Sequence, residues 1–187
     1  MSQAIVVIQG HLKPTPNAQE IYKNYLKGTV PLMKKYKVSI FAVGPGIQNE
    51  NTTSVFSINA LLLFPSSGHC NKFFSDPGYQ KIKSLYRDKA YASLDLSAFE
   101  CASNESNSSL IPPSTGTLTL VLNNSDVNGF NDSDILPFLR ATGQPMSFAN
   151  KCWSDFMLWI DTPSHLKEIN SAPNIRVTQW NNRLPHT

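Results

Sequence analysis

Over its first 100 residues the chain alternates strand-like and helix-like segments in the order β-α-β-β-α-β. Short β-branched or apolar runs predict strands over residues 4–8, 38–43, 55–64 and 91–99. Helical spacing of apolar residues predicts a helix over 18–36, and start signals predict two more over 66–74 and 76–89. Pro31 predicts a kink or break inside the first helix. This order is that of the ferredoxin-like, or split βαβ, unit.

The second part of the chain repeats this order in shortened form. Residues 101–116 are rich in Ser and Asn and carry a Pro pair, so they predict a linker between residues 1–100 and residues 117–187. The strands expected beyond the linker cover 117–122, 146–151, 155–160 and 174–180, and the expected helices cover 132–140 and 162–169.

A ferredoxin-like sheet has helices on one face only, so its other face must be buried against something. Two such units in one chain can cover each other. The sequence therefore predicts an α+β fold of tandem ferredoxin-like units (β-α-β-β-α-β twice), packed sheet to sheet as an internal dimeric α+β-barrel. Such a chain is either a monomer with an internal pseudo-dimer or a homodimer.

Alternation along the strands separates two kinds of face. The apolar sets, which should lie under the helices, are Phe56, Ile58, Ala60, Leu62 and Phe64, and Ala92, Leu94, Leu96 and Ala98. The opposite face collects Gln9, His11, Ser57, Asn59, Tyr91, Ser93, Asp95 and Ser97. Each buried polar group costs about 1–3 kcal/mol if it stays unpaired. This pattern predicts paired groups, held water or a ligand cavity between the sheets.

Two residues of the second half join these candidate ligand contacts. Trp159 and Arg176 lie on half-polar faces of their expected strands. A mostly apolar space with a few placed polar groups is typical of a small-molecule pocket. Arg176 could instead form a structural ion pair with Asp155, and Trp159 could be a core residue.

His11 and Asp95 form the candidate catalytic pair. The first and last strands of a ferredoxin-like unit pair antiparallel, and a register with Ile5 opposite Phe99 places Gln9 opposite Asp95. Asp95 then becomes a diagonal neighbour of His11. A carboxylate that orients an imidazole favours a general base. The alternative is that His11 leaves the strand into solvent.

Composition excludes several classes of function. The chain has 187 residues, with 16 Lys and Arg against 13 Asp and Glu, a net charge of +3 without a basic stripe. We therefore expect no nucleic-acid partner. No apolar run approaches the ~20 residues of a membrane span, and no signal peptide is evident, so we expect no membrane partner and a cytoplasmic location.

Metal and cofactor motifs are not found in the sequence. The three cysteines are widely spaced, no His, Cys and Asp cluster has metal-ligand spacing, and no glycine-rich phosphate-binding motif occurs. We therefore expect neither a metal nor a cofactor.

Four phrases in the first half carry a family resemblance. They are IYKNY at 21–25, VPLMKKY at 30–36, LFPS at 63–66 and SDPGYQKIK at 75–83. Together they resemble the dimeric α+β-barrel family catalogued as domain of unknown function 1330, over residues 3–100. The resemblance implies a ferredoxin-like unit with two sheets packed back to back. It also carries over Tyr79, and Arg87 eight positions further on, as ligand contacts.

The chain departs from the family pattern in places. Residues 42–45 read AVGP where an Arg and a Gly pair are usual, and residues 48–53 lack the usual acidic residue with Gly. The wider superfamily implies a cofactor-independent enzyme, of cyclase, isomerase, lyase or monooxygenase-like type, acting on a small apolar or aromatic molecule. Here His11 would move a proton, and Ser57, Asn59 or Tyr91 would hold a substrate oxygen. The alternative is a non-catalytic protein that binds a small molecule, or a structural protein.

Overall fold

The computed structural model describes residues 3–43, 47–48, 58–103, 118–123, 139–141, 146–149, 155–160 and 175–180. Four strands of the first half form an antiparallel sheet in the order β2-β4-β1-β5. They are β1 (Gln3–Leu12), β2 (Ser39–Val43), β4 (Ile58–Phe64) and β5 (Tyr91–Ser103). This is the strand order of a ferredoxin-like unit. The predicted register is confirmed, with Ile5 opposite Phe99 and His11 opposite Ser93.

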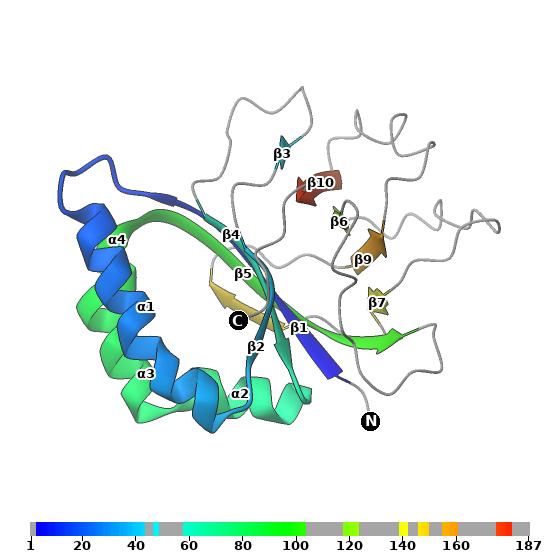
Figure 1. The fold of residues 1–187 in the computed structure, drawn as a ribbon, viewed down its shortest axis with the longest axis horizontal. Coiled ribbons are helices and arrows are strands. Elements are labelled where there is room, and N and C mark those ends of the chain that lie inside the picture. Colours follow the sequence, from blue (N-terminus) through cyan, green and yellow to red (C-terminus); the bar gives the residue numbers. More distant parts are fainter. Residues whose placement is uncertain are drawn as a thin grey trace.

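The helices of this unit all lie on one face of the sheet (Figure 1). They are α1 (Ala18–Lys35), α2 (Ser67–Ser75), α3 (Pro77–Ile82), the π-helix η1 (Lys83–Arg87) and α4 (Asp88–Ala90). The predicted start signals are confirmed: the Ser66 side chain accepts a hydrogen bond from the His69 N–H, and Asp76 accepts one from the Gly78 N–H. These side chains satisfy donors that a helix N-terminus leaves free.

The predicted break at Pro31 is wrong, because α1 runs without interruption to Lys35. A proline inside a helix removes one N–H donor but does not by itself unfold the turns on either side. Leu32 and Met33, which follow it, pack against the buried cluster under the helices and hold the last turns in place.

Five strands of the second half continue the sheet. They are β6 (Leu118–Asn123), β7 (Leu139–Ala141), β8 (Met146–Ala149), β9 (Asp155–Ile160) and β10 (Ile175–Trp180). Four of them, with the two-residue strand β3 (Ile47–Gln48), take the order β7-β9-β6-β10-β3. β5 joins the halves, since it pairs with both β7 and β8.

Four expectations for the second half and the linker need correction or lie, wholly or in part, outside the described residues. Residues 139–140, expected in a helix, belong to β7, because ladders with β5 and β9 on both sides outweigh local helix preference. The strand expected over 146–151 pairs with β5, so β7 takes its place beside β9. β5 also continues to Ser103, into the expected linker. The rest of the linker and the helix expected over 162–169 lie outside the described residues.

β6 covers the face of the first sheet that carries no helices. Leu120 and Leu122 are fully buried, in one cluster with Ile5, Val7 and Phe99. Figure 1 shows β6, β7, β9 and β10 on the opposite side of the first sheet from the helices. Elsewhere the second half also meets the helix layer, because Phe148 of β8 stacks on Phe74 of α2 with 4.2 Å between ring centroids.

Candidate functional site

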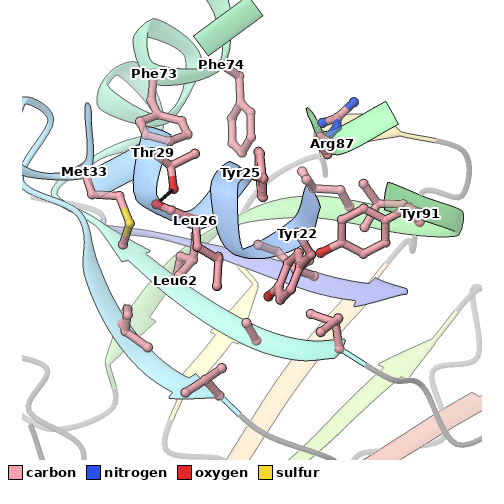
Figure 2. A pocket seen from close by; sticks show the side chains of 17 residues that line it. Tyr22, Tyr25, Leu26, Thr29, Met33, Leu62, Phe73, Phe74, Arg87 and Tyr91 are labelled. Carbon is pink, nitrogen blue, oxygen red and sulfur yellow. Dashed lines mark hydrogen bonds between the residues drawn. The ribbon is translucent and has the colours of Figure 1, made fainter. Parts of the chain in front are cut away.

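A cavity of about 280 Å³ lies between α1 and the helix-covered face of the sheet (Figure 2). The side of α1 that faces it contributes Tyr22, Tyr25, Leu26, Thr29 and Met33. Leu26 is 43% exposed, and Ile40 on the edge strand β2 is 48% exposed. The mouth of the cavity therefore lies between α1 and β2.

The floor of the cavity is the apolar face that alternation predicted under the helices. Its residues are Ile8, Ile58, Ala60, Leu62, Leu94 and Leu96. That prediction is confirmed for the described residues of β4 and β5, with one exception at the start of β5. Since these side chains offer no hydrogen-bonding group, the floor can bind only apolar surface.

Tyr91 is the exception. Strict alternation placed it on the polar face, but its ring lies on the helix face, against Tyr22 at 5.7 Å between centroids, and lines the cavity. The ladder between β1 and β5 explains the change. His11 pairs with Ser93 and Leu12 with Tyr91, so Ala92 is an extra residue in a bulge. A bulge reverses the alternation before it, which is also why Ala92 is exposed.

A glycine on β1 makes room for this tyrosine. A Cβ added to Gly10 would lie 2.7 Å from a ring carbon of Tyr91 and 2.8 Å from the Ser93 carbonyl oxygen. No side chain fits at that separation. Gly10 thus allows the Tyr91 ring to lie directly over the backbone of β1 at the end of the cavity.

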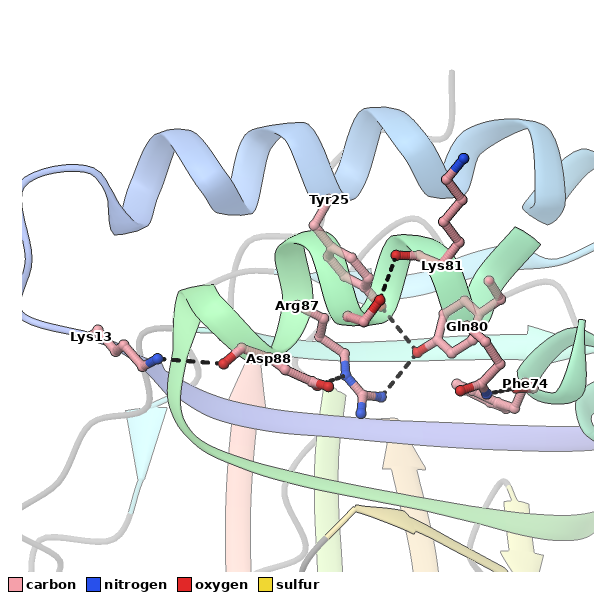
Figure 3. Close-up of polar contacts among 9 residues, drawn as sticks. Lys13, Tyr25, Phe74, Gln80, Lys81, Arg87 and Asp88 are labelled. Carbon is pink, nitrogen blue, oxygen red and sulfur yellow. Dashed lines mark hydrogen bonds and ion pairs between the residues drawn. The ribbon is translucent and has the colours of Figure 1, made fainter. Parts of the chain in front are cut away.

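Tyr79 and Arg87, the two residues carried over from the family resemblance, are joined by a hydrogen bond. Arg87 Nη1 donates to Tyr79 Oη at 3.0 Å, and Arg87 Nε donates to Asp88 Oδ1 at 3.1 Å (Figure 3). Tyr79 is 1% exposed and Arg87 5%. Of the two, Arg87 lines the cavity.

The π-helix explains how residues eight apart can meet. In a regular α-helix they would lie about 80° apart around the axis. A π turn takes up one extra residue, so the pair behaves as if seven apart, about 20° from alignment. η1 ends at Arg87 and so brings its guanidinium onto the face of the helix that carries Tyr79.

The tyrosines at this end of the cavity are neutral phenols. The hydroxyl oxygens of Tyr25 and Tyr79 are 3.3 Å apart, and those of Tyr22 and Tyr91 share a hydrogen bond. Burial raises the pKa of Tyr25 and of Tyr91 well above the usual value, and it raises the pKa of Tyr22 and Tyr79 as well. Those that line the cavity, Tyr22, Tyr25 and Tyr91, can therefore donate hydrogen bonds to a bound oxygen but do not serve as phenolate bases.

The predicted polar residues divide differently on the opposite face. Gln9 and Asn59 pair across β1 and β4, where Gln9 Nε2 donates to Asn59 Oδ1 at 3.2 Å, and both are buried. Ser97 is buried beside them along β5, whereas Ser93 is exposed. The structure thus pairs the two amides with each other. Pairing is one of the outcomes that the sequence left open for these buried polar groups.

His11 and Asp95 remain a predicted pair. Both are half-buried, and the confirmed register places Asp95 opposite Gln9, two ladder positions from His11. Neither is among the residues that line the described cavity.

Three other predicted contacts cannot be placed by their side chains. Ser57 lies outside the described residues. Trp159 stands opposite Thr119 in the ladder of β9 with β6, and Arg176 stands opposite Leu122 in the ladder of β10 with β6. Their side chains are not among those described.

Tyr22, Tyr25 and Thr29 are lining residues that sequence reasoning missed as site residues. Tyr25 is one of the residues whose helical spacing predicts the helix over 18–36. The signal in the sequence was the three hydroxyl groups that Tyr22, Tyr25 and Thr29 place on one side of that helix. A hydroxyl group that is buried needs a hydrogen-bond partner. Among the described residues, no group of three His, Cys, Asp or Glu side chains could hold a metal ion. No helix in the described part is both long and apolar enough to cross a membrane.

Comparison with known proteins identifies no family for this chain. No family model matches it, and no curated protein matches it. Solved structures do resemble it. One is a protein of unknown function from Rhodopseudomonas palustris, 15% identical, which covers 53% of this chain and 82% of its own length with a TM-score of 0.47.

Two further structures show the range of these likenesses. A dimeric protein of unknown function and ferredoxin-like fold from Bacteroides fragilis is 12% identical, covering 52% of this chain and 95% of its own, with a TM-score of 0.38. A Fusobacterium nucleatum protein provisionally named a monooxygenase is 10% identical, covering 96% of this chain and 92% of its own, with a TM-score of 0.47. At such values the likeness says nothing of the activity of this chain.

Proposed function

We propose that this chain binds a small, mostly apolar molecule of one or two rings in the cavity under α1. The observation that carries the proposal is the cavity itself, about 280 Å³ with a floor made only of aliphatic side chains. Protein interiors are close-packed, so a space this large beneath a helix is not the ordinary result of folding. Its polar groups gather at one end, which suits a ligand with one polar end.

Binding is better supported than catalysis. The described lining residues include four hydroxyl groups and one guanidinium but no His, Asp or Glu. Such donors stabilise an oxygen atom that gains negative charge. Cofactor-independent proton chemistry would need a base as well, and the predicted His11–Asp95 pair lies beyond this set. We therefore place a non-catalytic ligand-binding role first and a cyclase, isomerase, lyase or monooxygenase-like reaction second.

The test fills the cavity from its floor. Ala60 is 8% exposed and lines the cavity, so Ala60→Phe puts an aromatic ring into the space. We expect wild type to bind 2-acetylnaphthalene in calorimetric titration and Ala60→Phe to lose at least tenfold in affinity. Ala92→Phe is the matched control, because Ala92 is exposed on β5. Equal affinity in all three proteins would contradict the proposal.

The tandem architecture and the family membership belong to the same proposal. The order β7-β9-β6-β10 matches the order β2-β4-β1-β5 of the first sheet when the strands of each half are counted along the chain, with β3 and β8 set aside. This match supports a second ferredoxin-like unit. The Tyr79–Arg87 contact supports the resemblance to the family of unknown function 1330. Native mass spectrometry should find a monomer, because the second half covers the face that a single ferredoxin-like unit would use to pair with a second copy.

A further inference from the structure

We propose that Arg87, Tyr79 and Tyr25 form a one-directional chain of hydrogen bonds that presents the Tyr25 O–H to the cavity, selecting ligands with an acceptor oxygen. The ligand class that follows is a planar apolar ketone, or a molecule with an equivalent oxygen. This inference rests on the proposed function, because it names what the same cavity recognises.

The direction of the chain follows from what each group can donate or accept. An arginine side chain has donors only, so Tyr79 Oη accepts from Arg87 Nη1 at 3.0 Å. The Tyr79 proton must then go elsewhere. Among the described residues, the acceptor within reach is Tyr25 Oη at 3.3 Å. Tyr79 therefore donates to Tyr25, and the Tyr25 proton is left to donate onward.

The direction of the hydrogen bonds has an energetic consequence because Tyr79 is buried. Tyr79 is 1% exposed and is not a lining residue, so neither bulk water nor a cavity ligand can take its proton. Leaving a buried hydrogen-bond donor without an acceptor is unfavourable. Phe73 and Phe74 hold the Tyr79 ring from two sides, with centroid distances of 4.9 and 5.2 Å. The relay hydroxyl is thus fixed in place between Arg87 and Tyr25.

The Arg87 guanidinium sets this chain of hydrogen bonds apart from the pair formed by Tyr22 and Tyr91. Arg87 remains charged at any physiological pH, and hydrogen bonds in a row polarise one another in a low-dielectric interior. Tyr22 and Tyr91 share a hydrogen bond with each other, and Arg87 acts on Tyr91 through its charge, whereas the described hydrogen bond from Arg87 to a tyrosine goes to Tyr79. Tyr25, which reaches from α1 toward Arg87 in Figure 3, is therefore the stronger donor.

The experiment compares two probes that differ in one oxygen. 2-Acetylnaphthalene carries a carbonyl oxygen where 2-isopropenylnaphthalene carries a methylene group of similar shape. Dissociation constants for both are measured by calorimetry on wild type and three variants. We expect the ketone-to-alkene preference to fall about tenfold in Tyr25→Phe, the loss of one hydrogen bond. Tyr79→Phe should lower it about threefold, because Tyr25 then loses its polarising neighbour.

Tyr36→Phe is the matched control, a hydroxyl removed at the end of the same helix, where it donates to Asp76 and does not line the cavity. It should leave the preference within twofold of wild type. The preference is a ratio, so a general loss of stability or of cavity shape does not move it. Thermal unfolding of each variant establishes that it is folded.

The outcomes separate this inference from the proposed function. If both probes bind and Tyr25→Phe leaves the ratio unchanged, the donor chain is wrong and the binding role stands. An equal fall in Tyr36→Phe would also contradict the assignment to Tyr25. If neither probe binds wild type, the proposed function and this inference fall together.

Discussion

The two faces of the β2-β4-β1-β5 sheet are both buried, but they are filled in different ways. On the face away from the helices, Ile5, Val7, Leu61, Leu120 and Leu122 pack into one cluster. There, the amides of two buried polar residues bond to each other. On the helix face, an apolar floor is left partly uncovered and forms the cavity. Among the described residues, buried polar side chains therefore accompany a packed cluster, whereas the described cavity lies over residues that look like ordinary core.

The largest difference should appear when neighbouring leucines of β4 are truncated. Leu61 is fully buried in the packed cluster, so Leu61→Ala should lower the free energy of unfolding by about 3–4 kcal/mol. Leu62 already borders the cavity and is half-buried, so Leu62→Ala should cost about 1–2 kcal/mol. Urea unfolding measures both. Equal costs would mean that the two faces are equally well packed.

A smaller effect is expected from the amide pair on the packed face. Gln9→Leu leaves Asn59 without this donor in a buried position and should lower the free energy of unfolding by about 1–3 kcal/mol. The double variant Gln9→Leu with Asn59→Leu should recover part of that loss, because no amide is then left unpaired. A double variant that is less stable than either single variant would contradict this, because it would show that the pair stabilises the fold beyond satisfying the two amides.

Acid should loosen the helix face by a modest amount. The Asp76 carboxylate accepts hydrogen bonds from Lys35 Nζ and from the Tyr36 hydroxyl, both at 2.7 Å, which lower its pKa from 3.8 to about 2. A lowered folded-state pKa stabilises the fold above pH 4, and this contribution is lost as pH falls from about 4 to 2.

Asp76→Asn tests this link between the end of α1 and the start of α3. The variant should unfold at a lower temperature at pH 5, and the gap to wild type should close as pH approaches 2. Glu20→Gln, at an exposed carboxylate of α1, should show no such convergence. A gap that stays constant with pH would contradict the role of the charge.

Part of the fold could be predicted from the sequence because alternation and strand order follow from simple geometry. The register of β1 with β5 was predicted from the ferredoxin-like strand order, and Ile58, Ala60 and Leu62 under the helices were predicted from period-two spacing. The position of Tyr91 on the helix face could not be predicted in this way, because one bulged residue reverses the alternation and the local composition does not reveal the bulge. The meeting of Tyr79 with Arg87 depends on a π turn, and helical spacing alone would have set them apart.

The position of the cavity could not be predicted for a different reason. A sequence records which side chains are apolar, but the space left between them depends on how α1 sits over the sheet. The polar residues of the opposite face were the signal that the sequence offered, and the site predicted there, with His11 and Asp95, stays a prediction.

Three consecutive leucines on β4 allow the most direct test of where a ligand binds. Leu62 faces the cavity, while Leu61 and Leu63 lie in the packed cluster on the other side of the strand. Methyl NMR with 2-acetylnaphthalene should shift the resonances of Leu62 and Leu96 and leave those of Leu61 and Leu63 unchanged. Shifts confined to Leu61 and Leu63 would place the ligand between the sheets and contradict the account.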